Sequence, residues 1–247
     1  MRIELNPIDS EVVGRAVLEI TDVSDPAALA DAERAAVARH APLLAVCKVR
    51  AEDTPLLHAV EDLGFRFAEC QLQLRGRLLQ GVDVSGYLED YEYLRVERER
   101  DLDAVLALAG EIFENDRFSR DPRLGAALAG RRYQAYVRRS FAASDESVHA
   151  MRDRATGEVL AFTTHRRVSP REVRLLVGGV SRSHRRMGLA MASDQLEFAA
   201  HYRDGVRVLH SAVSSMNYPT LVGLCSYHRF HVVQSWVVLH KHYGSAT

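Results

Sequence analysis

The sequence has few cysteines and no long apolar run, which are features that mark secreted and membrane-spanning proteins. Its 247 residues include three cysteines, Cys47, Cys70 and Cys225, an odd number too widely spaced for a disulfide framework or a paired zinc-ligand pattern. No apolar run approaches the roughly 20 residues of a membrane span, and no basic and apolar leader opens the sequence. We therefore expect a cytoplasmic protein with reduced cysteines and no membrane association.

An excess of charge of one sign is also missing. Lys and Arg number 32 and Asp and Glu number 33, which gives a formal net charge of −1. Such a balance provides no global field for nucleic acid or an anionic membrane, so any anion-binding site must be local. The sequence has no Gly-x-Ser-x-Gly elbow, Walker loop or dinucleotide fingerprint, which excludes the corresponding hydrolase and nucleotide-binding folds.

What is present is enough apolar sequence, 47% of residues, to bury a core. Residues 1–85 are predicted to form a small β-α-β-α-β unit. The predicted strands cover 12–20, 43–49 and 65–74, and the predicted helices cover 25–39 and 54–63. A unit of this size has little core of its own, so we expect it to dock on the C-terminal part of the chain.

A larger unit is predicted over residues 92–247, which makes the fold a mixed α/β one. The predicted strands are 94–96, 148–151, 159–168, 173–180, 206–213 and 232–239, and the predicted helices are 101–113, one through 133–141, 187–200 and a short one from 219. Three antiparallel strands in a row are therefore followed by a helix and a further strand.

The junction over residues 177–190 carries the chemistry, because there a strand passes through a basic turn into a helix. Backbone N–H groups at a helix start point outward together, and the helix dipole adds positive potential. The small residues Gly188 and Ala190 allow a phosphate to approach the backbone, and Arg182, Arg185 and Arg186 add charge from the sides. This turn is a candidate anion site, and the alternative is an ordinary surface turn.

Arg185-x-x-Gly188-x-Ala190 resembles the pyrophosphate-binding signature of the GNAT superfamily of N-acetyltransferases. Within it, the chain looks most like the TDP-fucosamine acetyltransferase type, which N-acetylates a nucleotide-linked amino sugar. Residues 6–14, 63–65 and 116–121, followed by Tyr133 and Tyr136, carry this second resemblance. It implies a GNAT acyltransferase domain at 92–247 and a truncated GNAT-like domain at 1–85.

The resemblance also implies acetyl-CoA or another acyl-CoA as co-substrate, lying in a gap between the strands near 176–180 and 206–213. A backbone N–H near Gly179 or Val180 would bind the thioester oxygen, and no covalent enzyme intermediate is required. Gly178 and Gly179 suit a bulge or a close ligand approach. The implied cofactor-binding residues are Gly178, Gly179, Val180, Arg185, Arg186, Met187, Gly188, Leu189, Ala190 and Asn217.

The catalytic residues match the family pattern only in part. Asn217 fits the family's asparagine, but seven residues on stands Leu224 in place of the tyrosine that protonates the leaving sulfur. Either Tyr227, one helical turn on, serves as this acid, or no side chain does; Tyr227 as a core aromatic remains an alternative. His165 is a candidate base because its ordinary pKa is about 6.5, and a core or surface histidine is its alternative.

Arg117, Phe118 and Tyr133 are predicted to contact the acceptor, a small amine, with Arg117 facing its anionic part. The rival donors are a carrier-protein or aminoacyl-tRNA ester, for which the arginines near 131–139 would suit tRNA; the alternative for these arginines is a solvated helix face. A binding module that has lost its chemistry is the rival from another class. A homodimer stays open.

No metal is expected from the sequence. The pairs His228 with His231 and His240 with His242 invite a metal interpretation, but neither has a carboxylate or cysteine set nearby in sequence.

Overall fold

The computed structural model describes residues 1–113, 116–184 and 188–244. These residues form one ten-stranded sheet in the order β1-β2-β3-β10-β4-β9-β8-β7-β6-β5. The strands are β1 (Arg2–Leu5), β2 (Val17–Thr21), β3 (Leu44–Arg50), β4 (Arg66–Arg77), β5 (Tyr91–Arg95), β6 (Glu146–Asp153), β7 (Val159–Ser169), β8 (Glu172–Val180), β9 (Val208–Ser214) and β10 (His231–His242). Their mixed parallel and antiparallel pairing confirms the predicted α/β class.

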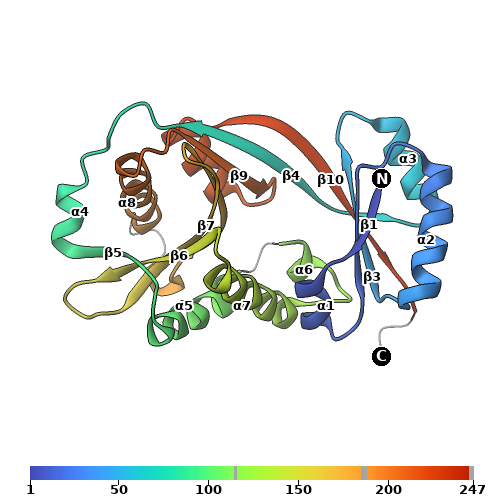
Figure 1. Ribbon diagram of the computed structural model, residues 1–247, viewed down its shortest axis with the longest axis horizontal. Helices are drawn as coiled ribbons and strands as arrows, with labels where there is room; N and C mark the ends of the chain where they lie inside the picture. Colours follow the sequence, from blue (N-terminus) through green and yellow to red (C-terminus); the bar gives the residue numbers. More distant parts are fainter. Residues whose placement is uncertain (114–115, 185–187, 245–247) are drawn as a thin grey trace.

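Helices cover both faces of this sheet (Figure 1). They are α1 (Pro7–Val13), α2 (Pro26–His40), α3 (Thr54–Asp62), α4 (Ser85–Asp90), α5 (Glu99–Ile112), α6 (Arg117–Arg120), α7 (Ala126–Ala142), α8 (Leu189–Arg203) and α9 (Tyr218–Leu221), with a 3-10 turn η1 (Arg182–His184) and a π-helical turn η2 (Val222–Tyr227). No helix among these ranges is long and apolar enough to cross a membrane.

Alternation along the strands decides which helix covers which face. On β7, Phe162 packs with α5 and α7 on one side, whereas its neighbour Ala161 packs with Leu189 and Leu196 of α8 on the other. In the N-terminal part, α2 and α3 pack on β2 and β3. Each face therefore has its own apolar cluster.

Two long strands join the N-terminal and C-terminal parts of the sheet. β4 lies between β10 and β9, and β10 pairs with both β3 and β4, so the first 85 residues contribute a strand that lies next to β9. Figure 1 shows β4 and β10 running from the part that holds α2 and α3 to the part that holds β9. The expected docking of the two parts thus takes place through one continuous sheet, and the division between 85 and 92 stays a prediction.

Capping residues in the sequence explain most helix boundaries. They also explain why one predicted strand is wrong. Asp53 caps α3 as predicted, since its carboxylate accepts from the Leu56 N–H at 3.2 Å. The strand predicted over 12–20 is wrong in its first half. Asn6 caps α1 through the Asp9 N–H at 2.9 Å, Gly14 ends that helix at φ +76°, and the strand begins only at Val17.

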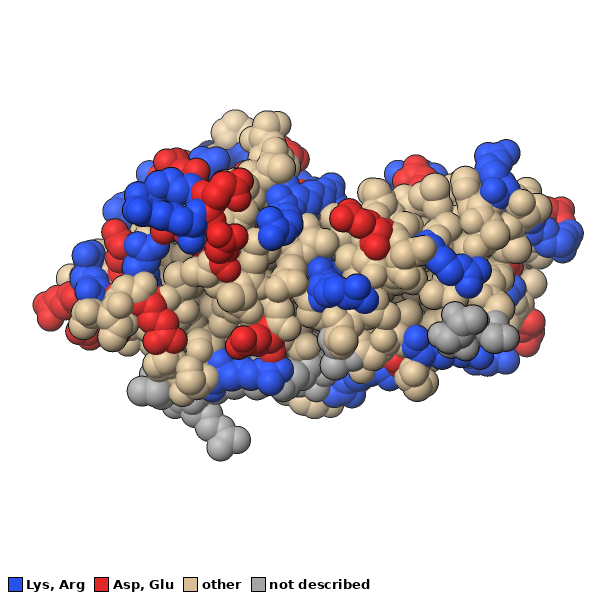
Figure 2. Space-filling view, turned by 90° about the horizontal axis from the view of Figure 1, so that it is seen from below, with Lys and Arg blue, Asp and Glu red and all other residues tan. Residues whose placement is uncertain are grey.

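Charges of both signs are interspersed on the face seen in Figure 2. Lys and Arg side chains on that face alternate with Asp and Glu, as the balanced composition leads us to expect. No single-sign field covers it.

Candidate functional site

The strands β8 and β9 pair in parallel over a short stretch and then diverge. Glu172, Val173 and Arg174 pair with Val208, Leu209 and His210, and the ladder then stops although β8 runs on to Val180 and β9 to Ser214. Backbone N–H and C=O groups on the facing edges therefore have no strand partner there among the described residues. An extended ligand with amide groups can pair with such edges.

A β-bulge marks the point on β8 where this gap opens. Thr164 of β7 faces two residues of β8, because His165 pairs with Leu175 while Thr163 pairs with Gly178. The Thr164 hydroxyl accepts from the Val177 N–H at 3.0 Å and donates to the Val177 carbonyl at 3.1 Å. The bulge predicted at the glycine pair thus lies just before it, and a buried hydroxyl satisfies its backbone.

The two glycines that follow the bulge stand where a side chain would be crowded. A Cβ on Gly179 would lie 2.3 Å from Cδ1 of Ile112, and one on Gly178 would lie 3.0 Å from the Phe162 carbonyl oxygen. A side chain at Gly179 would therefore require the end of the Ile112 side chain to move. Close approach of a ligand to these glycines stays a prediction.

The N-terminus of α8 lies at the end of β8 and is open. Gly188 occupies its N-cap with φ +79°, a conformation that favours glycine, and no side chain of the described residues caps the helix. Leu189 is buried, whereas Gly188 and Ala190 are exposed. Arg185, Arg186 and Met187 lie outside the described residues. The first-turn N–H groups of α8 are thus available for an anion.

Asn217 and the residues after it lie beyond the end of β9. The Asn217 side chain caps α9 by accepting from the Thr220 N–H at 3.4 Å. Leu224 is 5% exposed and packs with Phe198, so it belongs to the core, whereas Tyr227 at the end of η2 is 65% exposed. The core alternative for Tyr227 is therefore wrong, and its role as the acid stays a prediction.

His165 lies underneath α8 and is 2% exposed. Its Nε2 contacts the Glu197 carboxylate, and burial lowers the pKa of His165 because an imidazolium is poorly solvated there. The alternative in which His165 is a buried core histidine fits this position. Direct contact with an acceptor would require an opening next to α8, and the role as base stays a prediction.

The three predicted acceptor residues are brought together, but their side chains already have protein partners. The Arg117 guanidinium lies 3.4 Å from Glu69 and 3.8 Å from Asp9. Phe118 is fully buried in the core. Tyr133 stacks on a phenylalanine at a ring-centroid distance of 3.5 Å, and burial raises the pKa of its hydroxyl. Acceptor contact by these residues stays a prediction.

Sequence reasoning missed the ion-pair network that surrounds Arg117. Arg132 on α7 is 7% exposed and lies 2.7 Å from Asp9 and 3.8 Å from Asp116. Together with Glu69, the network holds three carboxylates and two guanidinium groups. The solvated-face interpretation of the arginines on this helix is right for Arg131, Arg138 and Arg139, which are exposed, and wrong for Arg132. The signal available in the sequence was the helical position of Arg132 between apolar neighbours.

Both histidine pairs have a carboxylate nearby, which corrects the sequence-based expectation. The Asp121 Oδ2 atom lies 2.8 Å from Nδ1 of His240 and 2.8 Å from Nε2 of His242. His228 lies 3.2 Å from Asp194. These carboxylates come from distant parts of the chain, so sequence neighbourhood did not reveal them.

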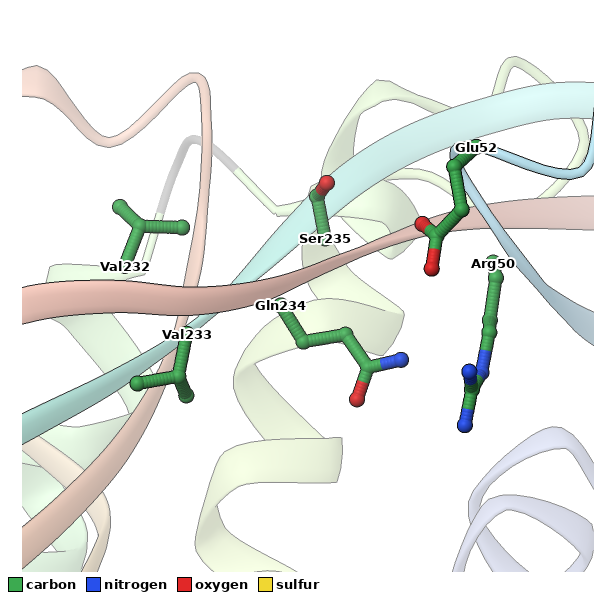
Figure 3. A pocket seen from close by; sticks show the side chains of 6 residues that line it. All are labelled: Arg50, Glu52, Val232, Val233, Gln234 and Ser235. Atoms are coloured by element: carbon green, nitrogen blue, oxygen red, sulfur yellow. The ribbon is translucent and has the colours of Figure 1, made fainter.

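An open surface depression of about 540 Å³ lies beside β10 (Figure 3). Its lining residues are Arg50, Glu52, Val232, Val233, Gln234 and Ser235. None of the predicted site residues is among them, so we do not assign it to the chemistry.

Comparison with solved structures identifies the architecture. A GCN5-related N-acetyltransferase from Sphaerobacter thermophilus matches at 18% identity over 83% of this chain and 62% of its own, with a TM-score of 0.61. The chain has the GNAT fold. Because the match covers 62% of that relative, this chain spans less than two thirds of its length. No family profile and no curated protein sequence matches the chain.

Two further structures with a GNAT fold match nearly the whole chain. A tandem GNAT protein from the clavulanic acid biosynthesis pathway matches at 14% identity over 93% of this chain and 76% of its own, with a TM-score of 0.60. A glucosamine N-acetyltransferase region of a fungal multi-domain GH3 β-N-acetylglucosaminidase matches at 13% identity over 97% of this chain and 31% of its own, with a TM-score of 0.67. The GNAT fold with a smaller N-terminal GNAT-like unit is thus confirmed.

Proposed function

We propose that this chain is an N-acyltransferase that moves an acetyl or other acyl group from coenzyme A to a small amine. The observation that carries the proposal is the parting of β8 and β9 directly beside the open N-terminus of α8. A ligand that combines amide groups with a pyrophosphate, as coenzyme A does, matches both features at once. The GNAT fold adds support.

In the proposed complex, the pantetheine arm pairs with the strand edges beyond Arg174 and His210. The pyrophosphate lies at the N–H groups that follow Gly188, and the sequence motif implies that Arg185 and Arg186 add positive charge. Asn217 closes the far side of the gap from the start of α9. Ligand charge is thus met by helix dipole and guanidinium groups in a chain with almost no net charge.

The proposed reaction is direct transfer. A neutral amine attacks the thioester carbonyl carbon, the carbonyl oxygen takes up negative charge next to the backbone N–H of Gly179 or Val180, and the C–S bond then breaks. The amine loses its proton and the sulfur leaves as thiolate, or as thiol if Tyr227 donates a proton. Because His165 is enclosed beneath α8, this reaction is proposed with the amine already neutral when it binds.

For the acceptor we propose a small amine with an amino sugar as the leading class, of the nucleotide-linked kind that the TDP-fucosamine acetyltransferase type acetylates. The glucosamine N-acetyltransferase region that shares this fold supports an amino sugar. Arg117, Phe118 and Tyr133 would border its site, where the surrounding network has one carboxylate more than it has guanidinium groups.

A second candidate function is an acyl-CoA-binding module without turnover. Leu224 favours it, because this core residue stands where the family has its acid. Carrier-protein or aminoacyl-tRNA donors remain the alternatives within the enzyme class, and a homodimer remains open.

Thermal shift with CoA and acetyl-CoA, followed by thiol release with a panel of amino sugars and other amines, tests the proposal. Stabilisation with thiol release supports the enzyme, and stabilisation without release on any amine supports the binding module. No stabilisation by any CoA species would contradict both. Tyr227→Phe then tests the acid: we expect kcat to fall by about a hundredfold or more with CoA affinity unchanged, and an unchanged kcat would exclude this role.

A further inference from the structure

Three potential metal ligands converge between β7 and the second half of α8. We place coenzyme A elsewhere, at the C-terminal end of β8 and the N-terminus of α8. Glu197 and His201 lie four residues apart on α8 and so share one helix face, and His165 faces them from β7. The side chains of His165, Glu197 and His201 are 3%, 2% and 8% exposed. Their Nε2, Oε1 and Nε2 atoms all lie within 4.8 Å of one another.

Ring nitrogens of this cluster are buried without hydrogen-bond partners. Nδ1 of His165 makes no hydrogen bond, whereas its Nε2 contacts the Glu197 carboxylate and Nε2 of His201 lies 3.8 Å from Oε1 of Glu197. A fourth imidazole, His149, lies 4.9 Å from His165 between ring centroids, and its buried Nδ1 is also without a partner. Buried polar atoms are nearly always satisfied, so such a concentration of exceptions calls for a missing partner.

The charges around the cluster suit a cation. No lysine or arginine among the described residues forms an ion pair with Glu197. A buried carboxylate is costly unless a positive charge compensates it.

We propose that His165, Glu197 and His201 bind a zinc ion that fastens α8 to β7. Two imidazole nitrogens and one carboxylate oxygen are ligands that zinc prefers. Tetrahedral zinc holds its ligand atoms about 3.3 Å apart, close to the 3.8 Å between Nε2 of His201 and Oε1 of Glu197. The ion would hold in place the helix whose N-terminus we assign to the phosphates, and it does not depend on the proposed acyl transfer.

The other histidine cluster differs in burial. Asp121 and His242 are only partly buried there, and His240 and His242 each make a hydrogen bond to Asp121. His210 makes a hydrogen bond to Glu172 at 3.1 Å and is partly exposed. Asp121 and His210, which belong to these clusters, serve as control positions for substitution.

The test uses the whole chain without a polyhistidine tag. Elemental analysis of the purified protein should find about one zinc per chain. After removal of metal with a chelator, zinc at about a hundred times its Kd should raise Tm by about 5–10 °C. A protein that is metal-free as purified and whose Tm does not respond to zinc would overturn the proposal.

Variants then locate the ion. Glu197→Gln keeps the side-chain volume and His201→Asn keeps a polar group, and each should weaken zinc binding more than about a hundredfold, since even outer-sphere changes cost about 10- to 100-fold. His210→Asn should bind zinc like the wild type. Zinc binding that survives Glu197→Gln, or that is lost instead in Asp121→Asn, would contradict the assignment.

A measurement on the wild type alone covers the case in which the variants do not fold. Cobalt(II) added to the metal-free chain should give the intense visible absorption of a four-coordinate site, and added zinc should abolish it. Absence of such absorption at saturating cobalt would refute a site of this geometry.

Discussion

Gly188 provides the sharpest test of the proposed phosphate site. It has φ +79° at the N-cap of α8, and a Cβ there would meet no atom within 4 Å. Gly188→Ala should therefore cost only the backbone strain of a left-handed residue, about 1–2 kcal/mol, or about 2–8 °C in Tm. The open space next to the helix N–H groups is where we place the pyrophosphate.

A methyl group in that space should keep a phosphate from the backbone. Loss of one charge-assisted hydrogen bond is worth about 1.5–3 kcal/mol, so the Kd for CoA should rise about 10- to 100-fold. Isothermal titration calorimetry with CoA measures the Kd, and urea unfolding measures the loss of stability.

Gly157 offers a matched control in the turn between β6 and β7. It is exposed, has φ +75°, and a Cβ added to it would likewise meet no atom within 4 Å. Gly157→Ala should lose as much stability as Gly188→Ala and keep CoA affinity. Equal CoA affinity in the two variants would refute the phosphate site, and unequal stability losses would refute the strain argument.

Three further predictions concern the framework around the site. Arg132→Met should lower the free energy of unfolding by about 3–5 kcal/mol in urea, because it leaves the Asp9 carboxylate without its 2.7 Å partner; combining it with Asp9→Asn should recover part of the loss, and additive losses would contradict this pairing. Thr164→Val should cost about 1–3 kcal/mol, since the partly buried N–H and C=O of Val177 lose their partner, while Thr164→Ser should cost clearly less; equal costs would show that the hydroxyl does not matter. Burial lowers the pKa of His240; its hydrogen bond to Asp121 opposes this shift and the Arg117 charge adds to it. As the pH falls, His240 is therefore protonated in the unfolded chain before it is protonated in the folded one. The free energy of unfolding should fall as the pH drops below about 6.5. His240→Asn should reduce that slope by up to about 1.4 kcal/mol per pH unit between about pH 6.5 and 5.5, and an unchanged slope in Tm or urea titrations would contradict it.

Local signals in the sequence were sufficient for most of the elements. Helix α3 is delimited by the Asp53 cap and the proline that follows, and the β6–β7 hairpin by Gly157 with φ +75°. α1 was missed because the apolar residues near its end continue into those of β2 and resemble one strand. Its Asn6 cap and Gly14 end were visible signals of a helix that the interpretation did not use.

The basic turn before α8 also came from the sequence, because a phosphate site at a helix start depends on a few neighbouring residues. Gly188 and Ala190 stand exposed at the position where the motif placed them. The parting of β8 and β9, which turns this motif into a candidate ligand site, was expected from the family resemblance and not from the residues themselves.

By itself, then, the sequence determined what depends on local spacing: most of the elements, the Asp53 cap, the bulge near Gly178 and a candidate anion-binding turn. Only the tertiary structure decided which distant side chains meet, because contacts between β7 and α8, or between Asp121 and His240, depend on sheet order and helix placement. His165 could thus be chosen from its strand and its pKa class, but not foreseen beside Glu197 and His201. The same holds for Arg132: the helix period places it among apolar neighbours, but only the fold pairs it with Asp9 and Asp116.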